Sequence, residues 1–114
     1  MPMFIDPKAT VAVTDGTNTV HIKAKMDART HALVKGAFSA RLGGESGKID
    51  LGNLGGYELA LLEHNIVRWE GPDFEGVPVT PVHIGRLDLD EPLIQEVLER
   101  IGELNPRQES PDPN

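Results

Sequence analysis

The sequence predicts an α+β fold in which an N-terminal β-hairpin packs against about three helices. Strand-like alternation of apolar residues is confined to residues 10–26, whereas helix-like apolar spacing recurs in three later segments, 27–40, 57–69 and 92–104. The chain has 114 residues, of which 39% are hydrophobic, so it can bury one modest core. We therefore expect a single small domain over residues 1–105.

The predicted hairpin has apolar residues at alternate positions in two short runs. Val11 and Val13 lie in the first run, and Val20 and Ile22 lie in the second. The turn Asp15-Gly16-Thr17-Asn18 separates them, and Gly and Asn both tolerate positive φ. Because an isolated hairpin is marginally stable, this one must pack on the helices or pair with a strand of another chain.

The first helix is expected from Asp27, as its N-cap, to about Ala40. A buried stripe is expected from residues four apart, which are the pairs Leu33/Ala37 and Val34/Phe38. Residues 43–56 contain six of the twelve glycines and predict a Gly-rich central loop. The sequence also allows a short strand at Lys48–Leu51 within this loop.

A second helix is expected from about Tyr57 to Arg68 or Trp69. Its apolar residues share one face: Leu59, Leu62, Ile66 and Trp69. Gly71-Pro72 is expected to end this helix. Thr80 followed by Pro81 has the pattern of an N-cap and first helical residue, which predicts a short helical turn through Ile84.

The last helix has the most regular apolar stripe of the chain: Leu93, Ile94, Val97, Leu98, Ile101 and Leu104. Asp88, Asp90 and Glu91 precede it, and acidic residues favour the start of a helix because they complement its dipole. Residues 106–114 are polar and rich in proline, which predicts a flexible tail.

The composition bounds the partners and the location of the protein. The formal net charge is −7, with no run of basic residues, so the chain should repel the phosphate backbone of nucleic acids. The absence of cysteine fits a reducing compartment, with the cytosol as the default. No segment approaches the ~18 apolar residues of a membrane span, and the N-terminus lacks the pattern of a signal peptide.

No pattern in the sequence indicates catalysis, a cofactor or a metal. Residues 43–48 resemble a phosphate-binding loop, but that motif requires Gly at position 42 and Ser or Thr at position 49, where Leu42 and Ile49 stand. The four histidines fall on different predicted elements without metal-ligand spacing: His21, His31, His64 and His83. The acidic residues before Pro92 lack the central Gly of a calcium loop. We therefore expect a protein that is not an enzyme.

The segment from Leu61 to Pro81 is the most specific pattern in the chain. It contains Ile66-Val67-Arg68-Trp69, then an acidic Gly/Pro turn from Asp73 to Pro78, then Thr80-Pro81. Together with Asp6-Pro7, the strand Val20–Lys23 and a final helix closing on Leu104-Asn105, this order resembles a family of small tailed-phage proteins described as tail assembly chaperones. The Gly-rich stretch has no counterpart in that pattern.

The resemblance implies a helper protein in the host cytoplasm. Such a chaperone binds the long helical tape-measure protein and recruits tail-tube subunits, which requires an exposed apolar surface. We predict a protein-binding surface formed by Ile66, Trp69, Phe74, Leu98 and Ile101. Core packing of Trp69 and of the last helix is the alternative explanation of the same residues.

Another class of function stays open. A structural virion subunit for tail completion, connection or decoration would oligomerise through the edge of the 10–26 hairpin. Such a subunit would be located in the mature virion, whereas a chaperone would be absent from it.

Overall fold

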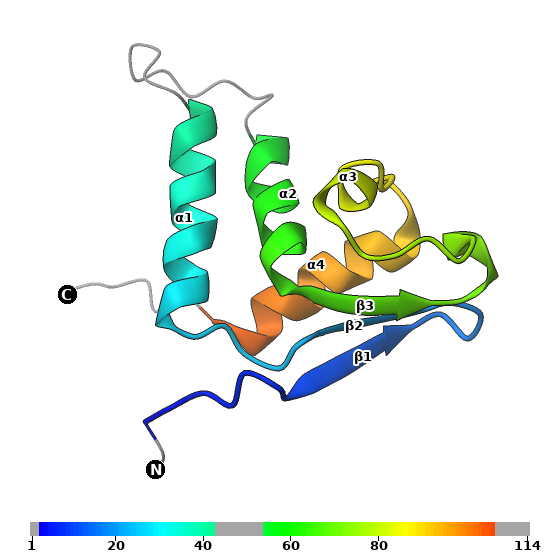
Figure 1. Ribbon diagram of the computed structural model, residues 1–114, viewed down its shortest axis with the longest axis horizontal. Helices are drawn as coiled ribbons and strands as arrows, with labels where there is room; N and C mark the ends of the chain where they lie inside the picture. The colour runs from blue at the N-terminus through cyan, green and yellow to red at the C-terminus, as the bar shows by residue number, and fades with distance from the viewer. Residues whose placement is uncertain (1–2, 43–53, 107–114) are drawn as a thin grey trace.

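The computed structural model describes residues 3–42 and 54–106, which form an α+β fold (Figure 1). Three antiparallel strands make one sheet in the order β1-β2-β3, with β1 at Thr10–Thr14, β2 at Thr19–Lys23 and β3 at Ile66–Glu70. The predicted hairpin is confirmed, since β1 pairs with β2. The third strand was not predicted.

The hairpin turn is held by its own side chains. Asp15 Oδ1 accepts hydrogen bonds from the backbone N–H groups of Thr17 at 2.9 Å and Asn18 at 2.8 Å. These donors lower the pKa of the Asp15 carboxyl, because they stabilise its charged form. Gly16 has a φ of 94°, which a residue with a Cβ adopts only with strain. The turn is therefore specified locally, as the sequence predicts.

Helices α1 (Ala28–Leu42) and α2 (Leu54–Asn65) lie side by side and project away from the sheet (Figure 1). The predicted cap of α1 is confirmed, because Asp27 Oδ1 accepts a hydrogen bond from the Thr30 N–H at 2.8 Å. Val34 is buried as predicted. Leu33 is 49% exposed, so the prediction that Leu33 belongs to the buried stripe was wrong. The side chains of Ala37 and Phe38 lie outside the described residues.

The second helix ends earlier than predicted. Helix α2 stops at Asn65, and Ile66–Glu70 continues directly as strand β3, which pairs with the free edge of β2. Asn65 Nδ2 donates to the Leu61 carbonyl at 2.9 Å, within the last turn of the helix. Gly71-Pro72 consequently ends a strand, and a short 3-10 helix, η2 (Pro72–Phe74), follows.

The central loop is shorter than predicted, because α2 already begins at Leu54. Residues 43–53, with the candidate strand at 48–51, and the tail from residue 107 lie outside the described residues. In the described part of the chain, no helix has the length and apolarity needed to cross a bilayer.

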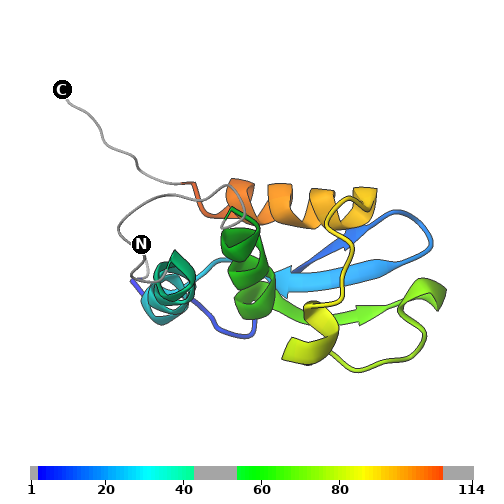
Figure 2. The ribbon, with the colours of Figure 1, turned by 90° about the horizontal axis from the view of Figure 1, so that it is seen from above.

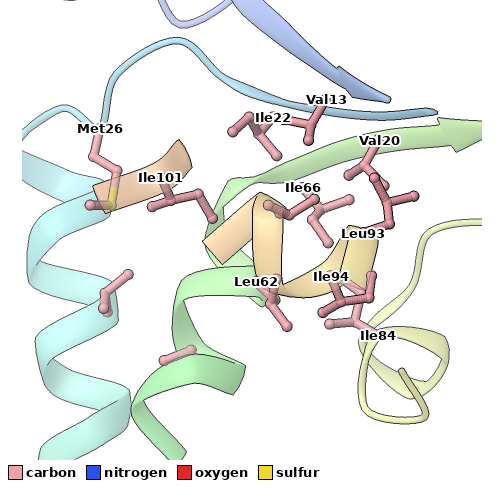
Figure 3. Close-up of a cluster of buried hydrophobic side chains, with 13 residues drawn as sticks. Val13, Val20, Ile22, Met26, Leu62, Ile66, Ile84, Leu93, Ile94 and Ile101 are labelled. Atoms are coloured by element: carbon pink, nitrogen blue, oxygen red, sulfur yellow. The ribbon is translucent and has the colours of Figure 1, made fainter. Parts of the chain in front are cut away.

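The two C-terminal helices are α3 (Pro81–Ile84) and α4 (Pro92–Leu104). The predicted start of α3 is confirmed, since the Thr80 side chain accepts a hydrogen bond from the His83 N–H at 3.2 Å. Helix α4 lies along one face of the sheet (Figure 2). Its buried residues are Leu93, Ile94, Val97 and Ile101, which meet apolar side chains of the strands and of α2 (Figure 3).

Candidate interaction surface

A β-bulge in β3 decides which of its side chains face the core. Ile66 pairs with Ile22 and Arg68 pairs with His21, so Val67 is an extra residue in the ladder. Beyond the bulge, Trp69 pairs with Val20. Ile66 and Trp69 therefore both pack on the core side of the sheet, although they are three residues apart.

Trp69 is the anchor of the turn that follows the strand. Its ring stacks on Phe74, with centroids 4.8 Å apart and planes within 2° of parallel. Its indole Nε1–H donates to the Val77 carbonyl at 2.8 Å. Both rings are half-buried and pack against the core, so each still presents part of its surface to solvent.

The buried side chain of Asn18 joins the hairpin turn to the Trp69 turn. Asn18 Nδ2 donates to Asp73 Oδ2 at 2.7 Å, and Asn18 Oδ1 accepts from the Asp73 N–H at 3.0 Å. Gly71 lies so close that a Cβ at this position would be 2.2 Å from Asn18 Oδ1. These contacts fix the aromatic pair at the end of the sheet.

The structure separates the five residues of the predicted contact surface. Ile66 is 7% exposed and Ile101 is 1% exposed, so both are core residues and neither is available to a partner in this structure. The prediction that these two residues belong to an exposed surface was wrong. Ile66 of β3 and Ile101 of α4 both point into the hydrophobic core between the sheet and the helix (Figure 3). Trp69 and Phe74 are in direct contact, and Leu98 is half-buried on α4.

Among the residues that the structure describes, the most exposed large apolar ones lie elsewhere and were missed from the sequence. Phe4 is 92% exposed and Met3 is 88% exposed, both in the segment before β1. Val82 on α3 is 72% exposed. Since α3 is only four residues long, Val82 has no helical periodicity around it that could have indicated its orientation.

The sheet face opposite α4 is polar. His21 and Arg68 are paired across β2 and β3 on this face, and His21 Nε2 lies 2.9 Å from Glu70 Oε2. The hydrogen bond from His21 lowers the pKa of the Glu70 carboxyl. Trp69 lies on the other, core side of the sheet, so the aromatic pair and this polar face are separate surfaces.

The residues considered for chemistry lie apart from one another. Among residues 3–42 and 54–106, no group of three histidine or acidic side chains is placed to hold a metal ion. His83 Nδ1 lies 2.9 Å from both Thr80 Oγ1 and the Pro78 carbonyl, so this histidine takes part in the cap of α3. The phosphate-loop-like residues 43–48 lie outside the described part.

Comparison of the chain with protein-family models, with curated proteins and with solved structures finds no match.

Proposed function

We propose that this chain is a non-enzymatic tail assembly chaperone of a tailed phage, acting in the host cytoplasm. The proposed partners are the tape-measure protein and the tail-tube protein. The observation that supports it most is the stacked pair Trp69 and Phe74, held at the end of the sheet and half-open to solvent. A fixed aromatic pair of this kind is a typical binding hot spot, because it loses little conformational entropy on binding.

The proposed contact surface is therefore narrower than the one predicted from the sequence. It retains Trp69, Phe74 and Leu98, the members that are not fully buried, and omits Ile66 and Ile101. The hydrogen bonds between Asn18 and Asp73 and the Trp69 Nε1 hydrogen bond hold the Trp69–Phe74 part of this surface in place before a partner binds. The chain needs no cofactor in this role.

The test is co-expression with the tape-measure and tail-tube proteins of the same genome, followed by pull-down and light scattering. We expect a soluble complex with the wild type and its loss with Phe74→Ala and Leu98→Ala combined. Ile101→Val is the matched control, because it trims a buried member of the original set and should lower stability while leaving binding intact. Circular dichroism establishes that each variant is folded. Absence of a complex with the wild type would reject the proposal.

One observation favours the second candidate, a structural virion subunit. Strand β1 is at the edge of the sheet, with Thr10, Ala12 and Thr14 exposed, and exposed strand edges are templates for pairing between chains. Mass spectrometry of purified mature particles separates the candidates: a virion subunit is retained in stoichiometric amounts, and a chaperone is absent.

A further inference from the structure

Charges of opposite sign are segregated onto the two longest described helices. On the outward side of α1, the side chains of Arg29 and Lys35 are exposed, and Lys25 is exposed just before the helix. On the outward side of α4, the exposed acidic side chains are Glu96, Glu99 and Glu103. Arg100 lies on the same helix, and its Nε is 3.3 Å from Glu103 Oε1, so Glu103 is paired within the molecule and the acidic character rests mainly on Glu96 and Glu99. Each helix therefore presents a face of one predominant charge to solvent.

The outward face of α1 carries small side chains between its basic residues. Helix α1 packs chiefly against α2, and the buried residues of α1 include Thr30 and Val34. Its opposite side carries the small exposed residues Ala28, Ala32 and Gly36, with the partly exposed Leu33 at one flank. Small residues on a helix face allow close approach of a second helix backbone.

The face of α4 has matching features. Gly102 lies among its acidic residues, and a Cβ built there meets no atom within 4 Å, so the surface is open at this point. Leu98 is half-buried at the flank of this face and offers an apolar contact.

We propose that the basic face of α1, defined by Arg29, Ala32, Leu33, Lys35 and Gly36, docks on the acidic face of α4 in a second copy of this chain. Within one molecule the two faces do not meet, because the basic face lies on the side of α1 away from α2 and the acidic face lies on the side of α4 away from the sheet (Figures 1 and 2). The contact is heterologous, because it joins different faces of the two copies. Its repetition builds either an open chain with one free face at each end or a closed ring. Leu33 lies at the flank of the α1 face and Leu98 at the flank of the α4 face, so apolar contacts border the charged pairs.

The test is sedimentation velocity of the full chain over a concentration series at low and high salt. We expect association at about 0.02 M NaCl that weakens at about 0.5 M, because exposed charges are screened beyond the ~10 Å Debye length of 0.1 M salt. Arg29→Glu/Lys35→Glu and Glu96→Lys/Glu99→Lys should each weaken association at least about tenfold, because like charges then face each other. The decisive sample is an equal mixture of these two variants, in which the reversed faces are complementary again and association should return.

Arg68→Glu/Arg86→Glu is the matched control for Arg29→Glu/Lys35→Glu, because it makes the same change in net charge outside both faces. The proposal is overturned by a monomeric wild type at low salt, by an equal effect of the control pair, or by a mixture that stays monomeric while both variants are folded. Association that persists in both reversed variants would also overturn it and would point to the β1 edge. The experiment needs no other protein, so its result is independent of the proposed chaperone function.

Discussion

Asn105 and Met26 are joined by a buried hydrogen bond across 79 residues of sequence, in which Asn105 Oδ1 accepts from the Met26 N–H at 2.8 Å. Asn105 Nδ2 also donates to the Ile101 carbonyl at 2.9 Å, so one side chain both closes α4 and holds the segment that leads into α1. The last helix is thereby tied to the hairpin side of the molecule.

Asn105→Ala should lower the free energy of unfolding by about 1–3 kcal/mol, because it leaves the buried Met26 N–H without an acceptor. Urea unfolding followed by circular dichroism measures the change. Glu99→Ala on the exposed face of α4 is the control and should stay within about 0.5 kcal/mol of wild type. Equal effects of the two substitutions would contradict the role given to Asn105.

Gly71→Ala should destabilise the protein more than Gly76→Ala. Both positions have positive φ, at 131° and 73°, but only the Cβ at residue 71 meets Asn18, at 2.2 Å from its Oδ1. We expect a loss of about 1 kcal/mol for Gly76→Ala from backbone strain alone and more than about 2 kcal/mol for Gly71→Ala. A Cβ at residue 71 would also lie 2.7 Å from the Asn18 Cα, so the effect of Gly71→Ala should shrink only in part in an Asn18→Ala background. A purely additive double-mutant cycle would show that the Asn18 side chain does not contribute to the clash.

Phe74→Ala should shift the fluorescence emission of Trp69 to longer wavelength, because the stacked ring shields one face of the indole from water. Trp69 is the only tryptophan, so the spectrum reports on this site alone. Val82→Ala is a comparison at an exposed apolar residue. An unchanged spectrum in a folded Phe74→Ala variant would mean that the two rings are not stacked in solution.

The Asp27 cap should stabilise the protein in a pH-dependent way. Hydrogen bonds from Thr30, first from its backbone N–H, lower the pKa of the Asp27 carboxyl from its reference value of 3.8. A lowered folded-state pKa adds stability that is fully present above the unfolded-state pKa and is lost as the pH falls through the folded-state pKa.

Asp27→Asn should therefore be less stable than wild type at neutral pH, and the difference should narrow as the pH falls below about 4. Urea unfolding at pH values between about 2 and 7 measures both curves. A difference that stays constant over this range would show that the charge of Asp27 does not contribute.

The sequence could not show which of the five residues of the predicted contact surface are buried and which reach the solvent. Trp69 and Phe74 were predicted to act together, and the structure places their rings in contact. Ile101 and Leu98 occupy the same helical stripe in sequence, yet one is buried and the other half-buried. A stripe gives the direction of a helix face, but how far the neighbouring elements cover its edges depends on packing.

The sequence by itself determined the features that adjacent residues control. These are the hairpin of residues 10–23, the caps at Asp27 and Thr80, and the start of α4 at Pro92, because turn and capping preferences arise from contacts within a few residues. Only the tertiary structure decided whether residues 66–70 form a helix or a strand. Their apolar residues are spaced as in a helix, but the β-bulge at Val67 gives a strand the same spacing. The free edge of β2 then supplied hydrogen-bond partners that no local pattern could indicate.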